Sequence, residues 1–272
     1  MEVPVYNLVG SEIKKVELPK VFQIPIRQDL IKRLFFYQYS HRIQPKGRYP
    51  YAGRDVSAEY FGVGLGISRI PRYKTQPLRG MGAVVAMARG GRRPHSPTVE
   101  KKIYKRINKK ELKLAVASAI SSTAKKDLVL SRGHIINDVP YIPLVVDNEV
   151  STISKTSEIR DVLMNLGVWA DIERVRNRVK IVGGKAAWRG RRRKLGVGPL
   201  IVYLEDKGIS MAVRNLPGVE AINVRNLSLI HLAPGGDPGR LTIWVEDTLK
   251  PLDERFRDII NRYVMEGVDY ES

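Results

Sequence analysis

A stretch of 38 residues, Tyr60–Pro97, contains no Asp or Glu but carries seven Lys or Arg side chains. It lies within a longer segment, residues 41–104, that holds nine glycines and six prolines. Gly and Pro disfavour regular helix and central strand alike. The segment also has few regularly spaced apolar side chains to offset the entropy of ordering it. We therefore predict a long loop without a core of its own, which is either disordered or built to bind a partner.

The positive charge of the chain is clustered. The 272 residues have a formal net charge of +19, yet residues 41–110 hold 17 Lys or Arg against 3 Asp or Glu. Residues 174–194 hold 10 Lys or Arg and no acid. Two basic segments on an otherwise mildly acidic chain indicate a polyanionic partner. The alternative, that basic surfaces only aid solubility, does not require such clustering.

Outside the loop, helical and strand patterns alternate. A hairpin is expected at residues 3–9 and 13–18. Helices are expected at residues 27–40, 109–124, 156–167 (capped by Thr156 or Ser157 and ended by Gly167), 169–176 and about 251–266, and strands at residues 127–131, 142–146, 179–182, 200–204, 220–224 and 241–245. Several strands are apolar throughout, as in buried parallel sheets. The pattern predicts an α/β body, residues 1–40 and 105–272, with an open, mostly parallel sheet flanked by helices and a long extended internal loop at residues 41–104.

Catalytic and metal-binding signatures are weak. The chain has no cysteine, so thiol chemistry, disulfides and thiolate zinc sites are excluded. Its four histidines lack metal-ligand spacing. Gly62–Gly66 departs from the dinucleotide fingerprint, and Gly183-Gly184-Lys185 lacks the rest of a phosphate loop. We expect no enzyme activity, no metal and no cofactor.

The chain shows no secretory signal at its start and no apolar run approaching the ~18 residues that span a bilayer. We expect a cytoplasmic protein with no membrane contact and no stable homo-oligomer.

The loop combines residue types that suit folded RNA. Arg binds phosphate through paired hydrogen bonds, Gly permits close backbone approach, and aromatic rings stack on unpaired bases. We expect the three arginines that flank Gly90-Gly91 to contribute most. The loop residues predicted to bind RNA are Arg48, Arg54, Arg69, Arg72, Lys74, Arg79, Arg89, Arg92, Arg93, Lys101 and Lys102.

A second basic patch follows residue 174. Arg174, Arg176, Arg178 and Lys180 alternate with uncharged residues, so an extended chain would place all four cations on one face. Trp188 lies among further arginines and is suited to stacking on a base or sugar, although a nuclear-import-like basic run and a packed Trp are alternatives. The residues of this patch predicted to bind RNA are Trp188, Arg189, Arg191, Arg192, Arg193 and Lys194.

Long stretches along the chain match one family. They are V-F-Q-I-P-I-R-Q-D-L-I (21–31), A-E-Y-F-G-V-G-L-G-I-S-R-I-P-R (58–72), M-A-R-G-G-R-R-P-H-S-P-T (87–98), R-N-L-P-G-V (214–219) and H-L-A-P-G-G-D-P-G-R-L (231–241). With these stretches the chain resembles, over nearly its whole length, the universal large-subunit ribosomal protein family called L four in bacteria, in its archaeal and eukaryotic branch.

The resemblance implies a structural constituent of the large ribosomal subunit that binds large-subunit rRNA and supports its assembly. It implies a body at the subunit surface and a loop whose tip helps to form the wall of the polypeptide exit tunnel, near the nascent peptide and opposite the L twenty-two family protein. The family often has Arg where Leu65 stands, which makes the tip less basic here. The tip residues implied are Gly62, Gly64, Leu65, Gly66, Arg69 and Arg72.

Two other functions remain open from the sequence. An RNA-modifying enzyme would hold a nucleotide or methyl-donor pocket at the strand ends of an open α/β sheet. A nonspecific nucleic-acid-packaging protein would bind duplex DNA and structured rRNA equally well.

Overall fold

The computed structural model describes residues 2–265. The chain forms two compact units: a body, which comprises the residues up to Tyr39 and from Arg106 onward, and a loop unit, Ser40–Lys105.

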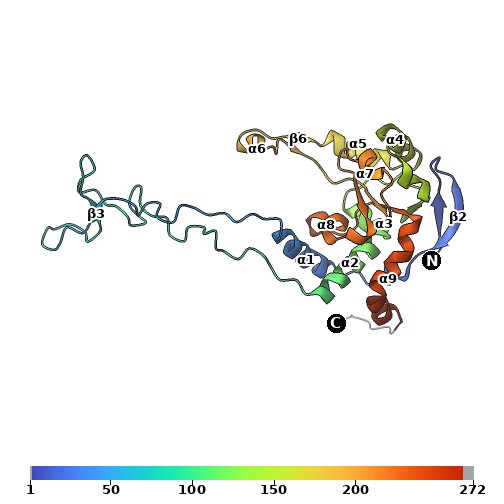
Figure 1. Cartoon of the computed structure of the whole chain (residues 1–272), viewed down its shortest axis with the longest axis horizontal. Helices are drawn as coiled ribbons and strands as arrows, with labels where there is room; N and C mark the ends of the chain where they lie inside the picture. The colour runs from blue at the N-terminus through green and yellow to red at the C-terminus, as the bar shows by residue number, and fades with distance from the viewer. Residues whose placement is uncertain (1, 266–272) are drawn as a thin grey trace. The chain divides into compact units, whose positions relative to one another are not determined.

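The body is built on a six-stranded sheet (Figure 1). Its strands, in spatial order, are β2 (Glu12–Glu17), β1 (Glu2–Tyr6), β5 (Leu144–Val146), β10 (Thr242–Val245), β8 (Leu200–Tyr203) and β9 (Glu220–Asn223). The hairpin β1–β2 is antiparallel and every other neighbouring pair is parallel. The predicted open, mostly parallel sheet is confirmed.

The central strands β5, β10 and β8 are buried on both faces, which explains why all their residues except Thr242 are apolar. Val145, Val202 and Trp244 join one core cluster, whereas their strand neighbours Leu144 and Ile243 join the other. The first cluster includes side chains from α1 (Gln28–Ser40), α2 (Lys109–Thr123), α8 (Leu229–Leu232) and α9 (Leu249–Ile260), and the second from α3 (Lys126–Ser131), α4 (Thr156–Asn165), α5 (Trp169–Asn177) and α7 (Ile209–Val213).

Short helical turns complete the body. Two small serines of α2 let this helix pack closely against the turn η1 (Lys20–Gln23) and the residues that follow it. Ser118 Oγ donates to Pro25 O at 2.9 Å and Ser121 Oγ to Phe22 O at 2.8 Å.

The remaining turns are η2 (Asn148–Thr152), η3 (Val224–Asn226), η4 (Pro234–Gly236), η5 (Glu246–Thr248) and the π-helical turn η6 (Asn261–Met265). The predicted last helix therefore ends in this turn, and Glu266 lies outside the described residues.

The strand predicted at residues 127–131 is wrong, because these residues form the helix α3. Val129 is fully buried whereas Leu130 is 44% exposed, so only one side of this short helix is buried. A run of three apolar residues fits both the period of a strand and that of a helix, so only packing in the folded protein decides between the two.

The capping prediction for α4 is also wrong, whereas its end is as expected. Lys155 occupies the N-cap without a side-chain hydrogen bond, and Thr156 is already helical. Gly167 follows the helix with φ +70°, and a Cβ there would lie 2.1 Å from Asp138 O. Glycine is thus required at this position by both backbone conformation and space.

The residues after α5 form a second arm, defined here as residues 180–194. It consists of β6 (Lys180–Ile181), α6 (Lys185–Trp188) and β7 (Arg193–Lys194), and β6 pairs antiparallel with β7 outside the main sheet. Figure 1 shows β6 and α6 projecting from the helices of the body. The predicted strand at 179–182 therefore exists in shortened form, as an exposed ribbon and not as a buried parallel strand.

The helix predicted at residues 169–176 is present as α5, so the alternating cations of residues 174–180 do not lie in an extended chain. Arg174 and Arg176 belong to α5, Arg178 is its C-cap, and only Lys180 enters a strand. The helical period is set by Ile172 and Val175, which are buried on the inner side of α5. The four cations consequently do not share one face.

Candidate nucleic-acid interface

The loop unit contains local structure of its own. Strands β3 (Ala58–Glu59) and β4 (Arg72–Tyr73) pair antiparallel, and Arg72 also bridges to Gly82. The Ala83 amide donates to Pro71 O at 2.8 Å, and Ala83 is fully buried. The expectation of a loop without a core of its own therefore needs correction here, because a small side chain is enclosed by folded backbone.

Glycines permit the close backbone approaches inside this unit. A Cβ on Gly53 would lie 2.4 Å from Gly91 O, and a Cβ on Gly91 would lie 1.9 Å from Val85 O. At these two positions the main chain of the loop occupies the space that a side chain would need. These glycines are therefore required for the folding of the loop itself.

Arg72 holds the turn that follows it. Its Nη1 donates to Gly80 O at 2.7 Å and its Nη2 to Ser68 Oγ at 3.0 Å, while its Nε is buried without a hydrogen-bond partner among the residues that the structure describes. Because these donors are used within the loop, Arg72 is a positioning residue for the predicted tip.

Replacing Arg72 by lysine is expected to loosen this turn, since one ammonium group cannot span both acceptors. Hydrogen exchange of the Gly80 and Met81 amides, which donate to Tyr73 O and Leu78 O, should accelerate by about tenfold or more, given the usual worth of charged hydrogen bonds. An Arg69→Lys variant is the matched control, because Arg69 is exposed and forms no ion pair in the part of the chain that is described. Equal protection in the two variants would contradict this role for Arg72.

The predicted tip residues are open to their surroundings. Gly62, Gly64 and Gly66 all have positive φ, and a Cβ on any of them would meet no atom within 4 Å. Leu65 is 57% exposed, and Val63, two residues earlier, is 72% exposed. The residues Gly62–Gly66 of the predicted tip therefore present backbone and apolar surface.

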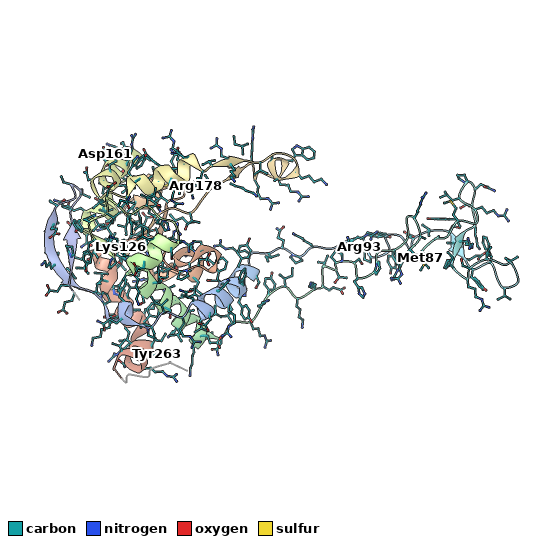
Figure 2. The ribbon with its side chains drawn as sticks, turned by 180° about the vertical axis from the view of Figure 1, so that it is seen from behind. Met87, Arg93, Lys126, Asp161, Arg178 and Tyr263 are labelled. Carbon is teal, nitrogen blue, oxygen red and sulfur yellow. The ribbon has the colours of Figure 1, made fainter. Side chains whose placement is uncertain are left out.

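All the other predicted loop cations except Arg92 are exposed to solvent, and Figure 2 labels Arg93 among the side chains along this segment. Lys74 pairs with Glu59, and it alone of the predicted loop cations forms an ion pair with a residue that the structure describes. Arg92 is half-buried. The exposed ones are Arg48, Arg54, Arg69, Lys74, Arg79, Arg89, Arg93, Lys101 and Lys102.

The second arm brings its predicted residues together on a short hairpin. Lys180 lies opposite Lys194 and Ile181 opposite Arg193, and Val182 N donates to Arg192 O at 2.7 Å. None of the arm's cations forms an ion pair within residues 2–265. All the predicted residues are exposed: Trp188, Arg189, Arg191, Arg192, Arg193 and Lys194.

Arg174, which precedes the second arm in the chain, uses its guanidinium group for hydrogen bonds within the body. Its Nε donates to Asp171 Oδ1 at 2.8 Å and its Nη2 to Val197 O at 2.9 Å. Asp171 is fully buried and also accepts from His134 Nδ1 at 2.9 Å and Ile135 N at 3.0 Å. Burial alone would raise the pKa of Asp171, but the hydrogen bonds from His134 and Arg174 outweigh it and lower that pKa. Sequence reasoning missed this cluster because His134 and Ile135 lie 37 and 36 residues away from Asp171 in the chain.

A second buried cation also serves the body. Arg240 is almost fully enclosed and donates to Gly198 O at 2.9 Å, to His231 O at 2.7 Å and to Glu220 Oε2 at 2.7 Å. Burial lowers the pKa of Arg240, and the Glu220 carboxylate opposes that shift. Arg240 thus ties the loops before β8 and β9 to the start of β10.

The usual cofactor position of α/β enzymes is poorly developed in this sheet. Where α/β enzymes bind cofactors, at the carboxyl ends of β5, β8 and β10, the hollow lined by Asn148, Leu204 and Asp247 measures about 140 Å³, below the about 300–1,000 Å³ of typical ligand sites. Within residues 2–265, no three His, Asp or Glu side chains are grouped to hold a metal ion. A search of the same residues found no helix with the length and apolar character needed to cross a membrane.

Comparison with known proteins gives a consistent result. The model of the ribosomal protein L4/L1 family matches residues 16–255. A protein of Methanopyrus kandleri, described as large ribosomal subunit protein uL4, is 44% identical over 257 residues, covering 94% of this chain and 99% of the relative. A protein of Saccharolobus solfataricus with the same description is 45% identical over 247 residues, covering 90% and 91%.

These matches extend over the α/β body and the basic loop together, and they define a structural ribosomal protein, not an enzyme. The chain belongs to the ribosomal protein L4/L1 family.

Proposed function

We propose that this chain is a constituent of the large ribosomal subunit that binds large-subunit rRNA, supports its assembly and contributes its loop tip to the wall of the polypeptide exit tunnel. The relatives are described as large-subunit proteins, and the chain matches almost their whole length. In this proposal the body, residues 1–40 and 105–272, binds rRNA at the subunit surface, and residues 41–104 enter the folded RNA.

One observation supports rRNA binding above the others: all the predicted cations except Arg72 and Arg92 are exposed, and all except Lys74 lack a carboxylate partner among the described residues. Arginines with free donors and no local counter-charge favour phosphate, which supplies both charge and paired acceptors. The mechanism is electrostatic and geometric. The cations neutralise phosphates where RNA helices crowd together, and counterions leave the RNA.

The tip supports the tunnel proposal by its composition. Gly62, Gly64 and Gly66 leave the backbone uncovered, and Leu65 offers an uncharged side chain. A wall passed by many different nascent peptides should bind none of them strongly, and a bare, weakly basic surface meets that need. The proposed neighbours are the nascent peptide and the L twenty-two family protein, and the proposed location is the cytoplasmic ribosome.

The affinity for large-subunit rRNA is expected to fall steeply with salt. If around ten cations touch phosphate, a plot of log affinity against log salt should have a slope on the order of −7 to −9. Filter binding or fluorescence anisotropy with the full chain, over a series of KCl concentrations, measures this slope. A nearly salt-independent affinity would overturn the electrostatic mechanism.

Two further measurements separate this proposal from the packaging alternative. A nonspecific protein would bind duplex DNA as tightly as structured rRNA, whereas the proposed function requires preference for large-subunit rRNA. The chain should also remain stoichiometric with large subunits after a high-salt wash, and its loss there would count against a structural role.

A further inference from the structure

Trp188 is the least expected surface residue of the body. Its side chain is 84% exposed, although a buried aromatic residue normally contributes strongly to stability. The other tryptophans are held by the fold: Trp244 is fully buried against Phe22, and Trp169 donates to Glu173 and lies under Arg160. The described fold therefore gains little from the indole of Trp188, which excludes the packed-Trp alternative.

The second arm presents this ring from a defined frame. The β6–β7 pairing closes its base, and main-chain bonds from Gly190 N to Ala187 O at 3.1 Å and from Arg191 N to Ala186 O at 2.9 Å close the turn around Trp188. Fixing the backbone in advance reduces the ordering cost when a ligand meets the ring.

The charge around the ring selects the kind of ligand. Residues 180–194 carry seven Lys or Arg and no acid. An apolar protein pocket would have to desolvate these cations without compensation, whereas a nucleic acid supplies phosphates beside its bases. The flat face of an indole pairs with the flat face of a base, and that face is accessible only where the base is unpaired or bulged.

We propose that the tip of the second arm is a stacking site for an unpaired RNA base, with Trp188 on the face of the base and the neighbouring arginines on the adjoining phosphates. This inference rests on the proposed function. It adds a second attachment point, separate from the loop, whose ligand is single-stranded or bulged RNA and not a duplex groove.

The test compares single-stranded oligoadenylate RNA with duplex RNA of equal phosphate number, using the full chain and its intrinsic tryptophan fluorescence. Oligoadenylate should quench the emission of Trp188, and the duplex should not. Trp188→Leu should lose that quenching and bind oligoadenylate about tenfold or more weakly, in line with the usual worth of base–aromatic stacking, with unchanged affinity for the duplex. Trp188→Phe, which keeps an aromatic face, should retain most of the affinity.

Other results would overturn the stacking site. If Trp188→Leu binds both RNAs like the parent while the salt slope for rRNA persists, the stacking site is refuted and the proposed function stands. If the parent shows no salt-dependent rRNA binding at all, both the stacking site and the proposed function are refuted. Quenching by phosphatidylserine vesicles that equals quenching by oligoadenylate would assign the indole to a membrane surface instead.

Discussion

Replacing Arg89, Arg92 and Arg93 together by alanine is expected to weaken binding to large-subunit rRNA by about 10²-fold at 0.1 M salt. Each lost phosphate contact should reduce the log–log salt slope by about 0.9, so the slope should become shallower by about 2.7. The three side chains flank Gly90-Gly91 and form no ion pairs within the described part of the chain. Anisotropy titrations at several salt concentrations measure both quantities, and incorporation into large subunits should fall in parallel.

The matched control removes the same charge from the body. Lys15, Lys207 and Lys250 are exposed and lie outside both basic segments, so their triple alanine variant has the same net charge as the loop variant. If both variants lose equal affinity, net charge and not the loop determines binding. The loop variant should keep the thermal transition of the body, because its three positions belong to the loop unit. Loss of that transition would show that these arginines serve the core.

Most of the fold could be predicted from the sequence because the apolar residues of its strands and helices recur with different periods and over different lengths. Strand β8 is a continuous apolar run, β10 is apolar after Thr242, and α9 places Leu252, Phe256 and Ile260 on one side. The errors fall where local signals are ambiguous. The apolar run at residues 127–131 is too short to distinguish the period of a strand from that of a helix. At residues 174–180 the alternation of charged and uncharged residues competes with the helical spacing of the apolar residues Ile172 and Val175.

The candidate interface was predictable in composition but not in detail. Charge clustering correctly indicated most of the exposed Lys and Arg side chains, because few acids in these segments are available to pair with them, but Arg72 and Arg92 are only partly exposed. It could not show that Arg72 hydrogen-bonds to Gly80 and Ser68, or that Ala83 is enclosed, because these depend on backbone geometry within the loop. RNA contact by these residues stays a prediction.

Replacing Asp171 by alanine is expected to destabilise the body by about 3–5 kcal/mol, the usual cost of breaking a buried ion pair by removing one partner. The change leaves Arg174 Nε, Ile135 N and His134 Nδ1 without their acceptor. Total stabilities of about 5–15 kcal/mol are typical, so this loss is a large fraction. Chemical denaturation followed by circular dichroism measures it.

Two variants define the origin of that loss. Asp171→Asn keeps the shape and one acceptor but not the charge, so it should fall between the parent and Asp171→Ala. Asp161→Ala, on the exposed side of α4 and labelled in Figure 2, should change the free energy of unfolding by less than about 0.5 kcal/mol. Equal losses at positions 161 and 171 would contradict a specific role for the buried cluster.

The same cluster sets a direction for pH dependence. Burial lowers the pKa of His134, although its hydrogen bond to Asp171 opposes this. The unfolded chain therefore binds a proton at His134 at a higher pH than the folded chain does, and stability should begin to fall as pH drops below about 6.5. The pKa of Asp171 is lowered as well, so its contribution is present above the unfolded value of about 3.9 and is lost as pH falls through the folded value. Both groups make acid destabilising, and Asp171→Ala should flatten the profile below about pH 4, where the missing carboxylate no longer titrates. A parent whose stability rises on acidification from pH 7 to pH 5 would contradict this account of the buried cluster.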